Sequence, residues 1–241
     1  MPAIYDERFY DIISDGSLQS ARRVLGFVFA LYRPASLLDV GCGAGTWLAA
    51  AQGLGLFPEA TLGIDGAHVP AAQFRVDRAA FQPRDLAQTV RVGRRFDLVV
   101  SVEVAEHLPL ERAPSFVEDL AAHGDTILFS AATPNQGGVH HVNEQWPDYW
   151  AALFSTAGFV QLDVIRPQVW ADDEIAWWYR QNAMIYTSDP RVAARFAPLP
   201  SFRGARLVHP ERFAYVSRQQ IMNAAAKKLG RILPRPLAQW S

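Results

Sequence analysis

Three closely spaced glycines follow a short apolar segment near the start of the chain, and an acidic residue ends the next apolar segment. Gly41, Gly43 and Gly45 come directly after residues 37–40, and glycines let a backbone turn sharply and approach a ligand that a Cβ atom would repel. Asp65 lies 20 residues after Gly45, where a carboxylate can accept hydrogen bonds from both hydroxyls of a ribose. This pattern predicts a nucleoside site, with a helix N-cap as the alternative role of Asp65.

The spacing of the glycines argues against two other nucleotide sites. A dinucleotide-binding turn needs a third glycine three residues after the second one, and Thr46 stands there. The Gly-Lys-Ser/Thr sequence of a phosphate-binding P-loop is absent. Neither a pyrophosphate cradle nor phosphoryl transfer is therefore favoured. Asp39, at the end of the apolar segment, could hold an amide of the turn or reach an ammonium group.

Histidines mark a second region that could carry chemistry, because imidazole is the natural base near neutral pH. His107 follows one apolar segment, and His140 and His141 lie in a polar, Gly-rich stretch after the next. We predict that His141 is a base oriented by Glu144 or Asn143, and that His140 and His107 are alternative catalytic candidates. A hydrogen-bonded surface loop is the competing interpretation.

Metal binding by this region is not predicted. His140, His141 and Glu144 could ligate a divalent cation, but the sequence has no second acidic cluster at a spacing typical of a metal site. A separate aromatic stretch, residues 177–182, could stack on a planar acceptor or sugar ring, although core packing is the more common role of such a cluster.

Continuous apolar segments alternate with helical patterns and must position these residues. Segments without polar alternation are typical of parallel strands covered on both faces, and strand–helix repetition implies right-handed crossovers in an open, doubly wound sheet. The expected strands cover residues 37–40, 61–64, 96–102, 126–131, 159–165 and 182–187, and the expected helices cover 17–32, 46–52, 113–122, 145–157 and 211–233.

Several of these motifs resemble those of class I S-adenosylmethionine-dependent methyltransferases. The sequence LLDVGCGAGTW at 37–47 is similar to their motif I, GID at 63–65 to their ribose-binding motif, and FDLVVSVEVAEHL at 96–108 to their fourth-strand motif. The resemblance implies a mostly parallel, seven-stranded, Rossmann-like sheet with a C-terminal helical extension, and S-adenosylmethionine as cofactor. It assigns the cofactor to a set of residues: Asp39, Gly41, Cys42, Gly43, Gly45, Asp65, Gly66, Asp85, Leu86 and Glu103.

Within that set, the resemblance implies a division of roles. Asp39 and the glycines would surround the methionine part, Asp65 the ribose, and Asp85 with Leu86 the adenine, while Glu103 and His107 would face the methyl group. The resemblance covers residues 36–187, so we expect a helical segment at 1–35, the methyltransferase domain at 36–187 and an extension at 188–241.

Net charge, cysteine content and hydropathy limit the partners and the cellular location that we expect. The net charge of −1 provides no global basic field for nucleic acid, and the lone Cys42 excludes an internal disulfide. No apolar stretch reaches the roughly 18 residues of a membrane span, and the N-terminus lacks a signal peptide, so we expect a cytoplasmic protein. The C-terminal extension could form a homodimer.

We therefore expect methyl transfer to a hydroxyl of a small polar acceptor, such as a sugar or secondary metabolite. The alternatives are an N- or carboxyl-methyltransferase, whose acceptors need alignment more than a base, and a non-catalytic cofactor-binding scaffold.

Overall fold

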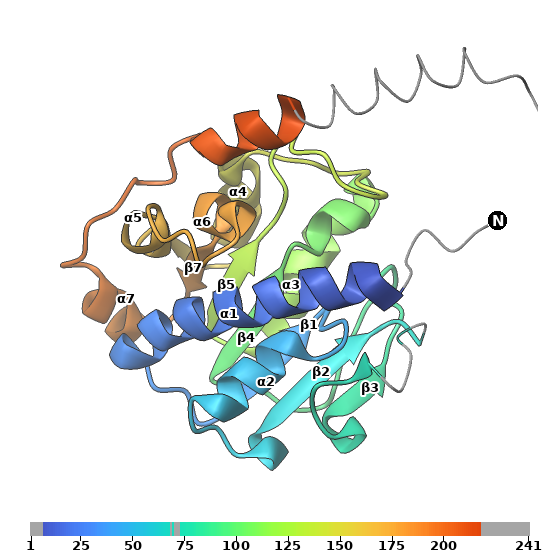
Figure 1. Cartoon of the computed structure of the whole chain (residues 1–241). Helices are drawn as coiled ribbons and strands as arrows, with labels where there is room; N and C mark the ends of the chain where they lie inside the picture. The colour runs from blue at the N-terminus through green and yellow to red at the C-terminus, as the bar shows by residue number, and fades with distance from the viewer. Residues whose placement is uncertain (1–6, 68, 70–72, 218–241) are drawn as a thin grey trace, which may run out of the picture.

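A seven-stranded sheet forms the centre of the computed structural model, which describes residues 7–67, 69 and 73–217 (Figure 1). The strand order is β3-β2-β1-β4-β5-β7-β6, and β7 is antiparallel to both of its neighbours. The predicted mostly parallel, doubly wound sheet is therefore confirmed. The strands are β1 (Leu37–Val40), β2 (Thr61–Asp65), β3 (Phe81–Pro83), β4 (Leu98–Val102), β5 (Thr126–Ser130), β6 (Val160–Leu162) and β7 (Met184–Thr187).

Helices cover both faces of the sheet and bury two separate hydrophobic cores. Helices α1 (Glu7–Leu31), α2 (Thr46–Gly53), α5 (Ile165–Val169) and α6 (Trp177–Asn182) pack on one face, seen at the front in Figure 1. Helices α3 (Ala113–His123) and α4 (Pro147–Thr156) pack on the other. Short 3-10 turns at Pro58–Ala60, Arg78–Ala80, Ala105–His107 and Leu110–Arg112 complete the connections, and α7 (Pro190–Phe196) follows the last strand.

The order of the strands determines where a ligand can bind. β1 pairs with β2 on one side and with β4 on the other, so the connections after β1 and β4 leave on opposite sides. An open α/β sheet has its ligand crevice outside the carboxyl ends of the strands at this switch point. The glycine turn follows β1 directly, as the sequence predicted.

The predicted strand at 159–165 is wrong in its second half. β6 ends at Leu162, and α5 begins at Ile165. The cause is a buried ion pair, in which Arg166 Nε donates to Asp163 Oδ1 at 2.7 Å and turns the chain out of the sheet. The last strand also begins two residues later than predicted, because Asn182 ends α6 and directs its side chain into a polar network.

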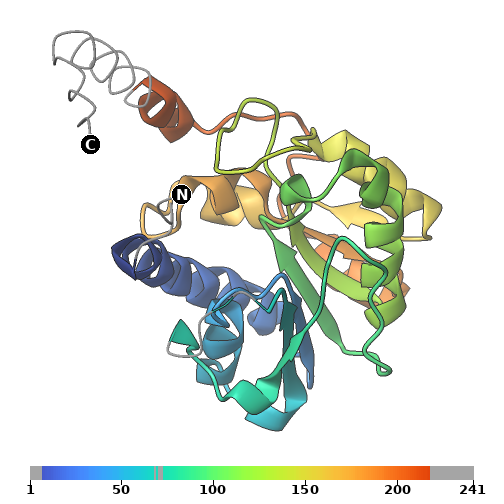
Figure 2. The same ribbon diagram turned by 90° about the vertical axis from the view of Figure 1, so that its right-hand side faces the viewer.

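Residues 205–217 cross the carboxyl end of the sheet and include a helical turn at 210–217 (Figure 2). Arg212 Nη2 donates to the Pro134 carbonyl at 3.3 Å, and His209 N donates to Gln181 Oε1 at 2.8 Å. Most of the helix predicted at 211–233, and the surface predicted to dimerise, lie outside the described residues. Among the described helices, none has the length and apolar character to cross a membrane.

Candidate functional site

A cavity of about 520 Å³ opens at the carboxyl ends of β1, β2, β3 and β4. Six of the ten residues that the sequence assigned to the cofactor line it, together with His107 and four neighbours, whereas Asp39, Cys42, Gly43 and Gly45 are not part of its lining. The lining consists of Gly41, Asp65, Gly66, Arg84, Asp85, Leu86, Ala87, Glu103, Val104, His107 and Leu108.

The glycine turn has a shape that side chains would prevent. Gly41 has φ +83°, and a Cβ atom there would lie 2.3 Å from Val104 Cγ2. Gly43 has φ +50°, and no atom lies within 4 Å of the position its Cβ would take. The first glycine therefore permits close packing against the end of β4, and the second leaves its backbone open to a ligand.

Two carboxylates lie beneath this turn. Asp65 accepts the backbone N–H groups of Gly43 at 2.7 Å and Gly66 at 2.6 Å. Asp39 is buried, and its Oδ2 has no hydrogen-bond partner. Burial, followed by repulsion from Asp65, raises the pKa of Asp39 well above its usual value. A buried carboxylate without a partner is a strong site for a cationic ligand group.

The remaining cofactor residues differ in what they offer. Asp85 is exposed and holds the N–H of Ala87 at 3.0 Å, while the buried Leu86 supplies an apolar wall. The Cys42 side chain is buried against Gly63, and burial raises the pKa of its thiol. Only the backbone of Cys42 is therefore available to a ligand in the cavity. Gly45, with φ +79°, ends the turn and caps α2.

Glu103 combines backbone strain with full hydrogen bonding at the mouth of the cavity. Its φ is +54°, an unusual value for a non-glycine residue, and strain of this kind concentrates at functional sites. Its carboxylate accepts Gln136 Nε2 at 2.8 Å and Asn182 Nδ2 at 3.1 Å. Gln181 extends the network, because its Nε2 donates to Gln136 Oε1 at 3.3 Å. Burial raises the pKa of Glu103.

The sequence analysis did not single out Gln136, Gln181 or Asn182. The only available signal was the presence of amides just beyond two expected strands.

The histidine-bearing loop is docked onto the turn that follows β4. The N–H groups of Val142 and Asn143 both donate to the carbonyl of Glu106, at 2.8 and 3.0 Å. This docking brings the rings of His107 and His141 into edge-to-face contact, with centroids 4.8 Å apart. Two segments more than thirty residues apart in the chain thus form one site.

Glu144 contacts the ring of His141, and it is one of the two residues that the sequence offered for orienting this ring. His141 Nδ1 lies 3.0 Å from Glu144 Oε1, and the same oxygen accepts the N–H of Gly137 at 3.0 Å. The predicted alternative, Asn143, is wrong, because its buried Nδ2 is directed at the Ala105 carbonyl instead. The ring of His141 lies against Gly138, where a Cβ atom would be 2.2 Å from Nε2.

The other two histidines differ in their positions. His107 lines the cavity, and burial together with the neighbouring His141 lowers its pKa, which favours the neutral ring. His140 is exposed and has φ +60°. His140 does not belong to the compact cluster of possible ligand atoms that Glu106, His107 and His141 form.

Glu106 is a further functional candidate, directly before His107 in the chain. Its side chain is fully buried, and among the described residues neither carboxylate oxygen has a hydrogen-bond partner. Burial, followed by repulsion from Glu103, raises its pKa well above the usual value. Such a group is costly to maintain unless another positive or polar partner joins it.

The aromatic stretch at 177–182 serves mainly as packing. Tyr179 is buried and contacts the Trp47 ring edge-on, with centroids 5.4 Å apart. Trp177 packs against Trp178 and Tyr215. Arg180, also buried, pairs with Glu211 at 2.7 Å and so ties α6 to the C-terminal segment.

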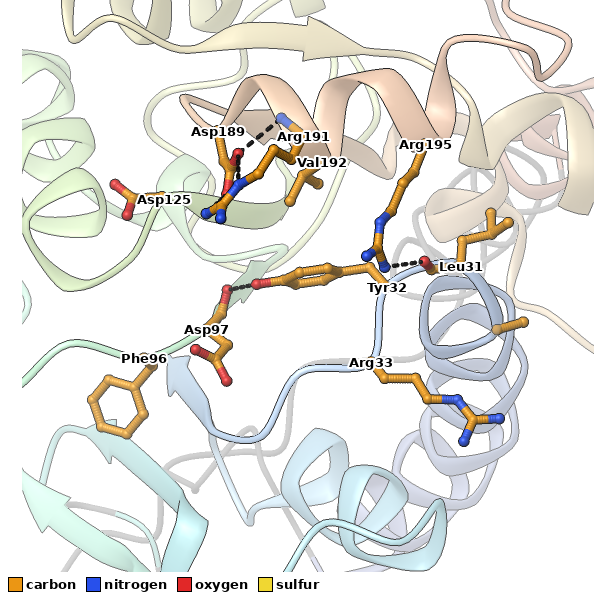
Figure 3. A pocket seen from close by; sticks show the side chains of 11 residues that line it. Leu31, Tyr32, Arg33, Phe96, Asp97, Asp125, Asp189, Arg191, Val192 and Arg195 are labelled. Carbon is orange, nitrogen blue, oxygen red and sulfur yellow. Dashed lines mark hydrogen bonds and ion pairs between the residues drawn. The ribbon is translucent and has the colours of Figure 1, made fainter.

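A second cavity, of about 570 Å³, lies at the opposite, amino end of the parallel strands (Figure 3). Tyr32 donates its hydroxyl proton to the Asp97 carbonyl at 2.8 Å, and Arg191 pairs with Asp189 at 2.8 Å. Arg195 donates to the Leu31 carbonyl at 3.3 Å. These polar groups are already paired within the chain, and the cavity is remote from the glycine turn.

Comparisons with known proteins agree with this geometry. A family model described as a methyltransferase domain matches residues 14–182. A ubiquinone biosynthesis O-methyltransferase from Methylobacterium sp. (strain 4-46) is 39% identical over 108 residues, which are 42% of this chain and 41% of that protein. The match thus spans about two fifths of the length of that relative.

Solved structures share the fold at low sequence identity. Magnesium protoporphyrin IX methyltransferase from Synechocystis PCC 6803 with bound S-adenosylmethionine has a TM-score of 0.55 at 17% identity, over 78% of this chain and 87% of that one. A sugar N-methyltransferase from Streptoalloteichus sp. ATCC 53650 has a TM-score of 0.56 at 15% identity, over 78% of this chain and 96% of that one.

Proposed function

We propose that this chain, which belongs to the methyltransferase-domain family and is a class I S-adenosylmethionine-dependent methyltransferase, acts on a hydroxyl of a small polar acceptor. The observation that carries the choice of a hydroxyl is the contact between His141 and Glu144, next to His107, which lines the cofactor cavity. A hydroxyl must lose its proton before or during attack, whereas an amine or carboxylate is already nucleophilic.

The residues at the carboxyl end of the sheet fit the cofactor. Its sulfonium and ammonium groups are cationic, and the buried Asp39, at the strand end before the glycine turn, has an Oδ2 atom without a hydrogen-bond partner among the described residues. Asp65 lines the cavity with a carboxylate suited to ribose hydroxyls, and Leu86 offers an apolar face to adenine. When bound, the cofactor supplies an electrophilic methyl group, and the chain supplies binding and orientation.

His141 is the residue that we assign to activation of the acceptor. When Nδ1 donates its proton to Glu144, Nε2 carries the free lone pair of a neutral imidazole. Glu144 is in turn held by the N–H of Gly137, so the ring has a fixed orientation. A base oriented by a carboxylate is a recurring arrangement for deprotonating hydroxyls.

Other methyltransferases of similar fold or sequence support a small-molecule acceptor. The relatives act, by name, on a ubiquinone precursor, a porphyrin and a sugar. The sugar enzyme methylates nitrogen, so the fold by itself does not select the atom. The contact between His141 and Glu144 is what favours oxygen in this chain.

The test compares turnover of S-adenosylmethionine with hydroxylated and amino acceptors, detecting products that have gained one methylene by mass spectrometry. We expect hydroxyl methylation, and we expect His141→Ala to reduce kcat by about 10²- to 10⁴-fold, the usual contribution of general acid–base catalysis. Cofactor affinity should stay unchanged, because His141 does not line the cofactor cavity.

Two outcomes would contradict this proposal. Full activity of His141→Ala would indicate an acceptor that needs no base, as in an N- or carboxyl-methyltransferase. Cofactor binding without any methylated product from any acceptor class would indicate a scaffold.

A further inference from the structure

We propose that Glu106, His107 and His141 form a binding site for a divalent cation at the acceptor end of the cofactor cavity. The inference rests on the proposed function and deepens it, since His141 would then activate the acceptor hydroxyl through a cation.

The three side chains already lie close enough to share an ion. One ligand atom from each, a carboxylate oxygen of Glu106 and a ring nitrogen of His107 and His141, lie within 4.8 Å of one another. Two ligands of one ion, each about 2.1 Å from it, are roughly 3.0–3.4 Å apart when adjacent and roughly 4.2 Å apart when opposite. Side-chain movements of about 1–2 Å would therefore bring the three atoms to coordination distance.

Both histidines are held as metal-binding histidines usually are. A ligating imidazole commonly gives its other ring N–H to a carboxylate or a backbone carbonyl, which fixes the ring and leaves one lone pair for the metal. His141 Nδ1 contacts Glu144 Oε1 at 3.0 Å, and the His107 ring hydrogen-bonds to the backbone of His140. The loop and the turn after β4 thus aim two imidazoles at one point.

The burial of Glu106 distinguishes this cluster from a group of polar residues on the protein surface. The Glu106 side chain has no solvent exposure, and among the described residues no hydrogen-bond donor reaches either of its carboxylate oxygens. Its charged neighbour is another carboxylate, Glu103, and no arginine or lysine of the described residues pairs with it, although the buried Asp119 and Asp163 each have an arginine partner. A cation shared with two histidines would supply the missing positive charge.

The composition of the site indicates the type of ion. Two imidazoles with one carboxylate suit divalent transition metals such as Mn²⁺, Co²⁺ and Zn²⁺, whereas Mg²⁺ and Ca²⁺ prefer sites made of oxygen alone. Three protein ligands leave positions open for an oxygen of the acceptor. A hydroxyl bound there would lose its proton to water more readily, because a divalent cation lowers the pKa of the oxygen that it binds.

The test begins with the full-length chain freed of metal by a chelator and titrated with Mn²⁺ by calorimetry and with Co²⁺ by visible absorption. We expect one ion per chain and a Co²⁺ spectrum that shows nitrogen ligation. Loss of a group that only supports a metal ligand usually weakens metal binding by ~10- to 100-fold. His107→Asn and Glu106→Gln each remove a ligand, so each should weaken Mn²⁺ binding by more than this. Glu144→Gln, which removes such a supporting group, should fall within that range.

His140→Asn is the matched control, because it removes an adjacent imidazole while asparagine tolerates the positive φ of this position. It should leave Mn²⁺ affinity unchanged. The proposal is overturned if Mn²⁺ and Co²⁺ do not bind, or if binding is insensitive to both His107→Asn and Glu106→Gln. Circular dichroism of each variant identifies any loss of fold, and the isosteric Glu106→Gln keeps the comparison informative.

Activity separates this inference from the proposed function. Loss of methyl transfer in chelator, restored by Mn²⁺, supports both. Undiminished hydroxyl methylation in chelator leaves the proposed function standing with His141 as a direct base, and overturns the cation. Cation binding without methylation of any hydroxyl would support the cation site and contradict the proposed function.

Discussion

Asp65 accepts the backbone N–H of Gly43 with one carboxylate oxygen, at 2.7 Å, while its other oxygen accepts the N–H of Gly66 at 2.6 Å. Gly43 has a positive φ and open space on its Cβ side. The carboxylate therefore joins the ends of β1 and β2 and sets the shape of the turn before any ligand is present. The cofactor-binding role that we propose for Asp65 depends on the same two oxygens as its role in the turn.

We predict that Asp65→Ala will weaken S-adenosylmethionine binding by about 10- to 150-fold, the equivalent of one charge-assisted hydrogen bond of ~1.5–3 kcal/mol. The loss combines a missing partner for the ribose with a less ordered turn. Isothermal titration calorimetry measures it. Asp77→Ala is the control, because Asp77 also holds a backbone N–H, that of Ala79 at 2.8 Å, but does not line the cavity. Equal affinities of the two variants would contradict the assignment.

Asp39 should couple cofactor binding to proton release. Its raised pKa means that the carboxyl holds a proton more tightly in the free protein, whereas a cationic ligand favours the ionised form. Calorimetry in buffers of different ionisation enthalpy should show proton release on binding near and below the raised pKa. Asp39→Asn should bind more weakly and release no proton from this position. Unchanged proton release in Asp39→Asn would show that the ammonium and sulfonium groups of the cofactor do not interact with this carboxylate.

The same shift predicts a pH dependence of stability in the cofactor-free protein. Between the ordinary pKa of Asp39, 3.8, and its raised value, the folded state keeps a proton that the unfolded chain has lost. The unfolding free energy should therefore fall as pH rises through this window, by up to about 1.4 kcal/mol per pH unit from this group. Asp39→Asn should show a shallower fall in urea unfolding. If the unfolding free energy of Asp39→Asn fell with pH as steeply as that of wild type, the raised pKa of Asp39 would be contradicted.

Much of the cofactor region could be predicted because its signals are local. Glycines that need positive φ, and carboxylates that end buried strands, follow the strand pattern, and the strand order places them together. Gly41, Asp65 and Asp85 accordingly line one cavity, and their contact with the cofactor stays a prediction.

The acceptor region was predicted less completely because its contacts are long-range. The partners of Glu103 are Gln136 and Asn182, which lie 33 and 79 residues further along the chain. Neither amide has a spacing that marks it as functional. The burial of Glu106 also depends on docking of the distant histidine loop onto its carbonyl, which no local pattern reports. The sequence could not choose between Glu144 and Asn143 for the same reason, because only the fold directs the Asn143 amide at Ala105.

Gly138 should control the orientation of His141. A Cβ atom at this position would lie 2.2 Å from His141 Nε2, so Gly138→Ala must displace the ring. We expect kcat to fall towards that of His141→Ala while the unfolding temperature changes little, because the loop is exposed. Gly137→Asn is the control, since nothing lies within 4 Å of its Cβ position and asparagine accepts a positive φ. Activity of Gly138→Ala equal to that of Gly137→Asn would show that the ring position is unimportant.

Two arginine–aspartate ion pairs beside the C-terminal segment differ in burial, which predicts unequal contributions to stability. Asp163 and Arg166 have side-chain exposures of 1% and 0%, and Arg166 Nη2 also donates to the Ala205 carbonyl at 3.0 Å. Asp148 and Arg206 are joined by two hydrogen bonds of 2.6 and 2.8 Å, but their exposures are 55% and 57%.

Asp163→Asn should lower the unfolding free energy by about 3–5 kcal/mol, because it leaves a buried guanidinium without its counter-charge. Asp148→Asn should cost no more than about 1 kcal/mol, since water and salt screen an exposed pair. Urea unfolding at fixed pH measures both. Both pairs are doubly hydrogen-bonded arginine–aspartate contacts, so desolvation is the cause of the expected difference. Equal losses in the two variants would therefore mean that the geometry of the pair, and not its burial, determines its contribution.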